Sequence, residues 1–580
     1  LTYGISLFIQ SQSWRHGYLF VSSCTLSLLL IAEFFYYSYS TSFLQVSALK
    51  YANQALSVSG TIDTLVTPKI ILFLFPPIVV VVSFFFSRSK KHTLINTDQK
   101  IAVGILIILL GTGGYGWLAA AETRELGSMK GLFTSPYDTN ALVGKMGIAN
   151  YFLEGVVKYA WHSKDVTQSD KAFVRDWNHS RPPTPPATHK SGIAKNRNII
   201  LIQIESLENS VLNTSIEGKE ITPTLNALAK SGAYFSNYFA QIGHGTTADA
   251  EFMILNSLYS LSDGVAFVDY PKNSYRALPQ FLSDNGYRTL VMHGDVATFW
   301  NRANIYPQLG YQTWIMKNDF SATREIGYQG LGDADFFSQS AEKLKGIKEP
   351  FMATLITLSS HTPFLLPDDV RTITLSKKSG LNETQRHYLE SIHYADAAVG
   401  SFITELKKSG LYDRSLIIIY GDHGSFTDIG DALNIDKDLP KDVAHQHVPL
   451  IILAPGTELK GMRSLPASHI DMYPTVANLL GLTPPRTILG QDLFNTNAPV
   501  MTYRKPSANA IGYIQSDTLS YTAAPDGIFN HGSCSDKDAH TLPIEKCQNI
   551  YETQTAQLKV SDITIKADII DVLTSEIKNN

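Results

Sequence analysis

Residues 415–424 read SLIIIYGDHG, and residues 198–208 read NIILIQIESLE. In each segment a short apolar run ends in ionisable residues, Asp422 and His423 in the first and Glu205 in the second. Apolar runs of this length, rich in β-branched residues, are typical of strands buried on both faces of a parallel sheet. Ligands of such sheets bind beyond the carboxyl ends of the strands. The two segments therefore predict strands at 198–204 and 415–420 that deliver carboxylate and imidazole groups to the same edge of the sheet.

Similar apolar runs alternate with helical patterns along the rest of this half. Further strands are expected at 288–292, 351–358 and 448–453, and helices at 223–231, 278–285, 334–344, 385–408 and 472–480. Several of these helices are followed by a glycine, which is typical of helix C-termini. His293 and His361 follow two of the strands, so we expect four strand ends to deliver ionisable or metal-ligating side chains to the same edge. This alternation predicts an α/β fold, a mostly parallel sheet flanked by helices.

The residues at the strand ends suit a divalent cation. Glu205 and Asp422 offer oxygen ligands and His423 offers a nitrogen ligand, a set that binds Mn²⁺, Mg²⁺ or Zn²⁺. For Asp422 and His423 alone, a turn with a capping residue explains the sequence equally well. Glu205 favours the metal site because a local turn would not require it.

Residues 243–252, GHGTTADAEF, predict a tight loop followed by a helix that begins at Thr246 or Thr247. A helix N-terminus favours a phosphate or another oxyanion. A threonine hydroxyl becomes a nucleophile when a cation or a base activates it, which points to attack on phosphorus or sulfur. The alternative is a helix N-cap, since threonine followed about three residues later by an acidic residue is a common capping pattern.

The first part of the chain is predicted to lie in a membrane. Three apolar stretches approach the length of about 20 residues that a helix needs to span a bilayer, and they lie at 18–37, 70–86 and 101–121. The loop after the second stretch is basic and marks the cytoplasmic side, with Arg88, Lys90, Lys91 and Lys100. We therefore expect an integral, multi-pass cell-membrane protein whose later residues lie outside the cytoplasm. The chain begins with Leu1, so we expect earlier spans to be missing.

Composition sets the remaining divisions. The formal net charge of −4, with 17% charged residues, gives no electrostatic indication of nucleic-acid binding.

The segment RPPTPPATHK at 181–190 has four prolines and predicts a stiff spacer. We expect transmembrane helices in 1–121, a juxtamembrane helix and linker in 122–195, a catalytic domain in 196–500 and a C-terminal subdomain in 501–580. Cys534 and Cys547 would form a disulfide in an extracytoplasmic compartment, and are otherwise free thiols.

Several motifs together carry a family resemblance. They are NIILIQIESLE, EITPTLNALA, GHGTTADAEFMILNSLY, MHGDVATFWNR, SSHTPF, YADAAVG, IIIYGDHG, and SHIDMYPTVANLLG with GQDLF. In these motifs the chain resembles the lipoteichoic acid synthase type of phosphoglycerol transferases, in the sulfatase-like branch of the alkaline phosphatase superfamily. The resemblance implies Thr247 as nucleophile and one divalent cation, most often Mn²⁺, held by Glu205, Thr247, Asp422 and His423. It also implies a headgroup pocket formed by His293, Trp300, Arg302 and His361.

The resemblance implies transfer of glycerophosphate through a threonine ester. The donor would be the membrane lipid phosphatidylglycerol, and the acceptor a polyol phosphate or a glycan of the cell envelope. A phosphoethanolamine transferase or another sulfatase-like hydrolase would share the threonine and the metal. A sulfatase proper needs a cysteine or serine as the precursor of its nucleophile, and no cysteine lies near Thr247. A catalytically silent binding module is the alternative outside the enzymes.

Overall fold

The computed structural model describes residues 2–40, 68–87, 98–107, 109–110, 143–144, 146–161, 166–181, 190–297, 299–321, 324–326, 330–495, 499–505 and 510–579. The chain forms two compact units, an N-terminal unit within residues 1–163 and a C-terminal unit that includes Lys164–Asn580. Each unit is described by itself.

The N-terminal unit is helical. Its elements are α1 (Thr2–Ser6), α2 (Gln12–Ser40), the 3₁₀ helix η2 (Pro68–Leu74), α5 (Phe75–Ser87) and α8 (Ile148–Trp161). Among the described residues one helix is long and apolar enough to cross a membrane, at Gln12–Phe35, and it contains most of the first predicted span. The second predicted span is a shorter apolar helix, Ile70–Phe85. Most of the third lies outside the described residues, although 98–107 are helical.

A nine-stranded sheet forms the centre of the C-terminal unit, in the order β12-β4-β11-β10-β1-β9-β5-β6, with β13 also paired to β4. The strands are β1 (Asn198–Ile204), β4 (Ala233–Phe239), β5 (Arg288–His293), β6 (Thr313–Ile315), β9 (Phe351–Ile356), β10 (Ser415–Gly421), β11 (His447–Leu453), β12 (Gly461–Arg463) and β13 (Ala467–Ser468). Only the pairs that β11 makes with β10 and β4 are antiparallel. The predicted α/β fold with a mostly parallel sheet is therefore confirmed.

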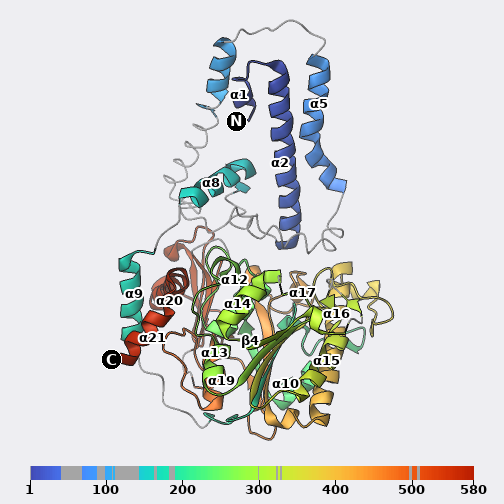
Figure 1. The fold of residues 1–580 in the computed structure, drawn as a ribbon, viewed down its shortest axis with the longest axis vertical. Helices are drawn as coiled ribbons and strands as arrows, with labels where there is room; N and C mark the ends of the chain where they lie inside the picture. Colours follow the sequence, from blue (N-terminus) through green and yellow to red (C-terminus); the bar gives the residue numbers. More distant parts are fainter. Residues whose placement is uncertain are drawn as a thin grey trace. The chain divides into compact units, whose positions relative to one another are not determined.

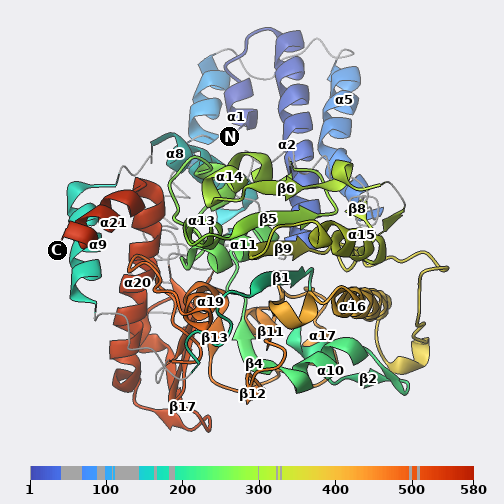
Figure 2. The same ribbon diagram turned by 60° about the horizontal axis from the view of Figure 1, so that its bottom comes forward.

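Helices cover both faces of this sheet (Figures 1 and 2). One face packs against α10 (Pro223–Ser231), α15 (Asp333–Lys345) and α16 (Glu383–Lys408), and the other against α11 (Thr247–Asn256), α13 (Leu278–Asp284), α14 (Arg302–Leu309) and α19 (Met472–Leu480). Strand β1 shows why both faces are apolar. Ile199 and Leu201 belong to the buried cluster of the second face, and Ile200 and Ile202 to that of the first, because successive side chains point to opposite faces.

Small elements complete the unit: α9 (Gln168–Ser180), α12 (Ala266–Asp269), α17 (Ile429–Ala432), α18 (Lys441–Ala444), and the hairpins β2–β3 (Ser215–Ile216, Lys219–Glu220) and β7–β8 (Glu325–Ile326, Gly330–Leu331).

The end of the chain forms a second sheet and two helices. The sheet is antiparallel, in the order β14-β15-β16-β17-β18. Its strands are β14 (Val500–Arg504), β15 (Ile511–Ser516), β16 (Leu519–Thr522), β17 (Ser533–Asp536) and β18 (Thr541–Leu542), followed by α20 (Gln548–Ala567) and α21 (Ile570–Asn579). A disulfide joins Cys534 to Cys547. Apolar residues of this region share one buried cluster with α11 and α19.

Candidate metal centre and active site

The parallel register of the central strands brings the predicted ligands together. Strand β1 lies beside β10 with Ile204 opposite Gly421. The next residues, Glu205 and Asp422, therefore leave the sheet at the same edge. Strands β9 and β5 run parallel to β1 on its other side, so His361 and His293 emerge at this edge as well. The convergence of four strand ends that the sequence predicted thus follows from the sheet order.

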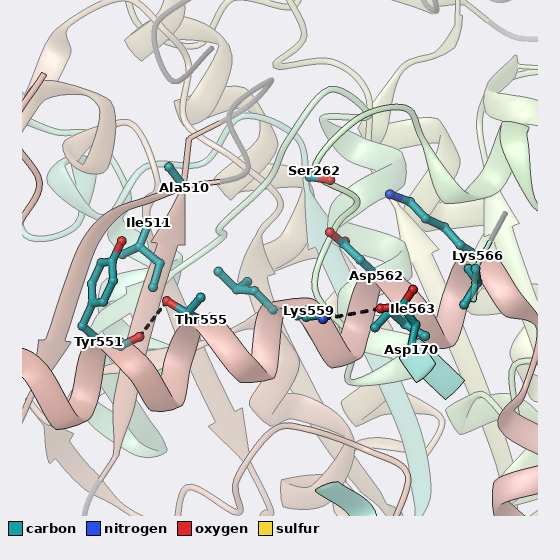
Figure 3. Close-up of a pocket in the computed structure, with 12 residues that line it drawn as sticks. Asp170, Ser262, Ala510, Ile511, Tyr551, Thr555, Lys559, Asp562, Ile563 and Lys566 are labelled. Atoms are coloured by element: carbon teal, nitrogen blue, oxygen red, sulfur yellow. Dashed lines mark hydrogen bonds and ion pairs between the residues drawn. The ribbon is translucent and has the colours of Figure 1, made fainter. Parts of the chain in front are cut away.

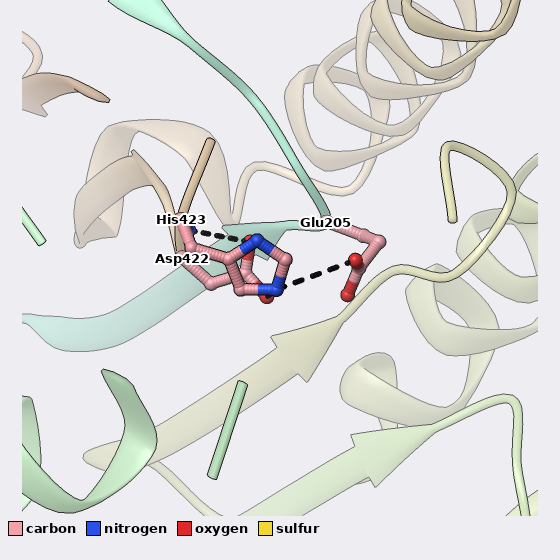
Figure 4. A group of neighbouring side chains, drawn as sticks. All are labelled: Glu205, Asp422 and His423. Atoms are coloured by element: carbon pink, nitrogen blue, oxygen red, sulfur yellow. Dashed lines mark hydrogen bonds and ion pairs between the residues drawn. The ribbon is translucent and has the colours of Figure 1, made fainter. Parts of the chain in front are cut away.

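Glu205, Asp422 and His423 form a compact buried cluster (Figure 4). One potential ligand atom from each lies within 4.8 Å of the others. The Nε2 atom of His423 is 3.5 Å from Glu205 Oε1 and 3.5 Å from Asp422 Oδ2. All three residues are at most 3% exposed.

Neighbouring groups fix the orientation of these ligands. The ring of His423 donates from Nδ1 to the carbonyl of Gly424 (2.8 Å), so in the neutral imidazole Nε2 keeps the lone pair that faces the two carboxylates. Ser206 touches both acids. Its backbone N–H donates to Asp422 Oδ1 (2.8 Å) and its hydroxyl to Glu205 Oε1 (2.8 Å). Such supporting contacts are typical of metal sites.

The cluster has the properties that a divalent cation requires. Asp422 Oδ2 is buried, and no described residue gives it a hydrogen bond. Burial, and then the charge of the adjacent Glu205, raises the pKa of Asp422 well above its usual range. A cation would offset both effects, because two carboxylates and a neutral imidazole supply oxygen and nitrogen ligands around one point. The residues therefore fit a divalent metal ion.

Thr247 is the first residue of α11, and its side chain meets this cluster. Its Oγ1 lies 3.4 Å from Glu205 Oε2 and 3.4 Å from His423 Nε2. Thr246 is the N-cap residue, but its side chain makes no capping hydrogen bond. The second threonine of the motif is thus the one beside the predicted metal ligands.

A buried aspartate on α11 holds the loop that leads into Thr247. Asp249 Oδ2 accepts hydrogen bonds from the backbone N–H groups of Gly243 and Gly245, both at 2.9 Å. A Cβ atom at Gly245 would lie 2.5 Å from Asp249 Oδ1, so a larger residue there would displace the carboxylate. Burial raises the pKa of Asp249 to about 7.

Comparison with known proteins places this geometry in a family. Residues 197–482 match the family model "Sulfatase" and residues 1–168 match "Lipoteichoic acid synthase N-terminal domain". Lipoteichoic acid synthase 1 of Bacillus subtilis is 32% identical over 76% of this chain and 68% of its own length. Lipoteichoic acid synthase of Staphylococcus aureus is 30% identical over 85% of this chain and 77% of its own length.

The chain belongs to the lipoteichoic acid synthase family. A solved structure agrees with this assignment: the lipoteichoic acid synthase LtaP from Listeria monocytogenes superposes with a TM-score of 0.62 at 26% identity, covering 68% of this chain and 97% of that one. As a member of this sulfatase-like family, the protein is a phosphotransferase. The family resemblance inferred from the motifs is confirmed.

The two predicted pocket histidines lie near the cluster of this family member. His293 donates from Nδ1 to the carbonyl of Ile356 (3.0 Å). Burial, and then the positive charge of Arg302, lowers the pKa of His293 to about 3, so the ring is neutral at physiological pH. The ring of His361 donates from Nδ1 to the carbonyl of Thr362 (2.7 Å). The pKa of His293 also responds to the charge of Glu205, after burial and Arg302, so His293 lies near the acidic residue of the cluster.

Arg302 and Trp300 are placed differently from each other. The guanidinium of Arg302 is buried and donates from Nε and Nη2 to Glu251 Oε1, at 3.1 and 2.7 Å. Its Nη1 has no hydrogen-bond partner within the described part of the chain, which leaves that atom to contact a ligand. Trp300 lies in the 3₁₀ turn η4 (Phe299–Asn301), is partly buried, and has its ring 5.7 Å from that of Phe299.

A separate cavity of about 310 Å³ lies beside α20 (Figure 3). It is lined by residues such as Tyr551, Lys559 and Lys566, and Lys559 pairs with Asp170 of α9 at 3.4 Å. None of the predicted site residues lines it. We therefore assign the chemistry to the strand-end cluster.

Three supporting residues were not singled out from the sequence. Ser206, Asp249 and Glu251 contact a metal ligand, the loop before Thr247 and Arg302, respectively. Asp249 and Glu251 lie in the quoted motif, two and four residues after Thr247. Helical spacing puts positions i and i+4 on one face, a signal that could have identified Glu251.

Proposed function

We propose that this chain transfers the glycerophosphate headgroup of phosphatidylglycerol to an extracytoplasmic acceptor through an ester on Thr247. One observation carries the proposal: Thr247 Oγ1 lies 3.4 Å from both Glu205 Oε2 and His423 Nε2. A hydroxyl at the start of a buried helix and against metal ligands is placed for activation as a nucleophile. The family membership supports phosphoryl transfer as the reaction class.

Glu205, Thr247, Asp422 and His423 would hold the cation, for which we propose Mn²⁺. Bound there, the ion would make the Thr247 hydroxyl more acidic and offset charge on the phosphoryl oxygens. His423 would contribute Nε2, since its Nδ1 donates to Gly424. Arg302 would contribute its Nη1 to a phosphoryl oxygen, since its other donors bind Glu251.

The two half-reactions are balanced as follows. Thr247 Oγ loses its proton and bonds to phosphorus, while the bond from phosphorus to the diacylglycerol oxygen breaks. That oxygen takes up a proton, and diacylglycerol leaves. An acceptor hydroxyl then loses its proton and bonds to phosphorus, while the bond from phosphorus to Thr247 Oγ breaks and Oγ takes up a proton. We propose that His361 moves these protons and that His293 and Trp300 contact the glycerol.

We further propose a multi-pass membrane protein with its catalytic unit outside the cytoplasm. The apolar helix at Gln12–Phe35 and the shorter one at Ile70–Phe85 support membrane anchoring. The disulfide between Cys534 and Cys547 supports the compartment, because disulfides persist in oxidising surroundings. The division into segments 1–121, 122–195, 196–500 and 501–580 is part of this proposal. The acceptor would be a polyol phosphate or a glycan.

The test is mass spectrometry of the full chain in detergent after incubation with phosphatidylglycerol and Mn²⁺. We expect a glycerophosphate adduct on the peptide that contains Thr247 and release of diacylglycerol. Thr247→Ala should show neither. Phosphatidylethanolamine serves as the matched donor. A phosphoethanolamine adduct formed in preference to glycerophosphate would overturn the donor, and full turnover by Thr247→Ala would overturn the nucleophile.

A further inference from the structure

Glu251 lies on the same helix as the proposed nucleophile, one turn further on. Thr247 and Glu251 are four residues apart in α11, so their side chains leave the same face. Glu251 is 2% exposed. A carboxylate this deeply buried requires a partner, because taking its charge out of water costs free energy.

Its partners are two side chains of α14. Glu251 Oε1 accepts from Arg302 Nε (3.1 Å) and Nη2 (2.7 Å), and Oε2 accepts from the hydroxyl of Tyr306 (2.8 Å). Arg302 and Tyr306 are also four residues apart and also fully buried. Both carboxylate oxygens are thus engaged, and the guanidinium is held by two of its nitrogens in a fixed plane.

Stability alone is a weak explanation of this arrangement. A buried ion pair is often no more stable than well-packed apolar residues of the same volume. This pair also leaves a buried donor unsatisfied, since Arg302 Nη1 has no hydrogen bond to any residue that the structure describes. An unsatisfied donor on a charged group, fixed by contacts on its other side, is the arrangement expected where a ligand supplies the missing acceptor.

The surroundings of Arg302 indicate where that ligand lies. Its positive charge acts on His293, which also feels Glu205 and His361. Glu251 leaves the same face of α11 as Thr247, one turn away, and the guanidinium binds Glu251, so the guanidinium lies on the side of α11 that carries Thr247. Burial lowers the pKa of Arg302, but Glu251, Tyr306 and Asp295 together raise it above its ordinary value, so Arg302 remains protonated.

We propose that Glu251 is a positioning residue that fixes Arg302 so that Nη1 donates to a phosphoryl oxygen of the group attached to Thr247. The proposal rests on the proposed function and gives two residues of α11 separate roles in it. The first residue of α11, Thr247, supplies the nucleophile, and the fifth, Glu251, orients the Arg302 guanidinium that offsets the phosphoryl charge. Because Thr247 and Glu251 lie on one helix, the distance between the Thr247 hydroxyl and the Arg302 guanidinium would stay constant.

The experiment measures kcat/KM for phosphatidylglycerol in mixed micelles with the full chain. Glu251→Gln should lower kcat/KM on the order of 10- to 100-fold, because small displacements of a positioned group have effects of that size. Arg302→Gln should lower it at least as much. The double variant should be no worse than Arg302→Gln alone, since Glu251 acts only through Arg302. Additive effects, or an unaffected Glu251→Gln, would overturn the proposal.

If Glu251→Gln does not fold, Arg302→Lys is the variant to measure, because it keeps an ion pair with Glu251. A lysine has one ammonium group, which would bind Glu251 and leave no donor directed at the phosphoryl group. We expect a loss close to that of Arg302→Gln, and near wild-type activity would overturn the proposal. An inactive wild-type chain would instead refute the proposed function on which this one rests.

A second buried ion pair provides the matched control. Arg504 donates to both oxygens of Asp562, at 2.9 and 3.0 Å, and lies outside the predicted site. Asp562→Asn should lower the unfolding temperature but leave kcat/KM of the folded protein within about threefold of wild type. An equal loss of kcat/KM in Asp562→Asn and Glu251→Gln would overturn the positioning role, because breaking any buried pair would then suffice.

Discussion

Among the described residues, two clusters each combine two carboxylates with a histidine, and they differ in burial and in the hydrogen bonds that their carboxylates accept. Glu205, Asp422 and His423 are buried, while Asp536, Asp538 and His540 lie on a hairpin turn where His540 is largely exposed. In the exposed cluster, the backbone N–H groups of Asp538 and His540 already donate to Asp536 Oδ1. The ring of His540 lies 3.1 Å from Asp536 Oδ2.

The comparison of the two clusters shows that proximity of potential ligands is not sufficient for a metal site. The carboxylate of Asp536 has its own turn as a partner, and hydrogen bonds lower its pKa, the largest from the backbone of His540. The carboxylate of Asp422 is held at Oδ1, while its buried Oδ2 accepts no hydrogen bond from the residues that the structure describes. A cation gains most where charge is buried and uncompensated, so we expect binding at the first cluster and not at the second.

The largest expected effect contrasts these two aspartates directly. Asp422→Asn keeps an oxygen for the N–H groups of Ser206 and His423 but replaces the unpaired oxygen by an amide. Because losing a group that only supports a ligand already costs about 10–100-fold in affinity or activity, we expect a larger loss of both Mn²⁺ affinity and turnover. Calorimetric titration with Mn²⁺ and the diacylglycerol assay measure them.

Asp536→Asn is the control for this prediction. It changes the same group in the exposed cluster, so Mn²⁺ affinity and turnover should stay at the wild-type level. Saturating Mn²⁺ should raise the stability of the wild type and of Asp536→Asn equally, by about 2.7 kcal/mol at a hundredfold excess over Kd. Loss of metal binding in Asp536→Asn with retention in Asp422→Asn would reverse the assignment.

The buried cluster was predictable from sequence because the end of an unbroken apolar run indicates where a buried strand ends. The predicted strand 198–204 coincides with β1, and 415–420 ends one residue before β10 does. Strand β4 was not predicted: its sequence AYFSNYF is interrupted by Ser236 and Asn237, which are only partly buried. Its position between β11 and β12 depends on tertiary pairing rather than on an unbroken apolar run.

Contacts between distant polar residues were beyond sequence reasoning for a related reason. The partners Glu251 and Arg302 are 51 residues apart, and no local pattern relates two charged residues at that distance. Arg302 was expected to contact the lipid headgroup, and two of its nitrogens are already bound to Glu251. Charge pairing within the protein competes with charge pairing to a ligand, and only the fold shows which nitrogen atoms remain.

A smaller effect is expected beside the exposed cluster. The Cys534–Cys547 disulfide closes a 13-residue separation around the hairpin that carries Asp536. Replacing both cysteines by serine should lower the free energy of unfolding by about 2–4 kcal/mol. Turnover of the folded protein should not change, since no metal ligand lies in this hairpin. Thermal unfolding with and without reductant measures the first quantity, and a matching loss of turnover at low temperature would contradict the separation of the two regions.

The smallest expected effect concerns Asp333, a buried carboxylate that, unlike Asp422, does not belong to a cluster of potential metal ligands among the described residues. Asp333, the first residue of α15, accepts at Oδ1 from the backbone N–H groups of Leu358 and Ser359, at 2.9 and 3.1 Å. Its Oδ2 is buried, and the described residues offer it no hydrogen bond. Burial raises the pKa of Asp333 to about 6. For Asp422 a bound cation would compensate the buried charge, whereas Asp333 can only take up a proton.

This proton sets the sign of a pH dependence. The pKa is near 3.9 in the unfolded chain and about 6 in the folded one, so between these values the folded state binds more protons. The stability that Asp333 contributes is therefore present below pH 4 and falls as the pH rises through 6. Asp333→Asn mimics the protonated form and keeps Oδ1 as the acceptor, so it should be more stable than wild type at pH 7, by at most about 3 kcal/mol. The measurement is the difference in unfolding free energy between the two proteins from pH 4 to 7, with the exposed Asp413→Asn as control. A difference that stays constant over that range would show that Asp333 is already ionised in the fold, and that burial alone does not separate it from the exposed carboxylates.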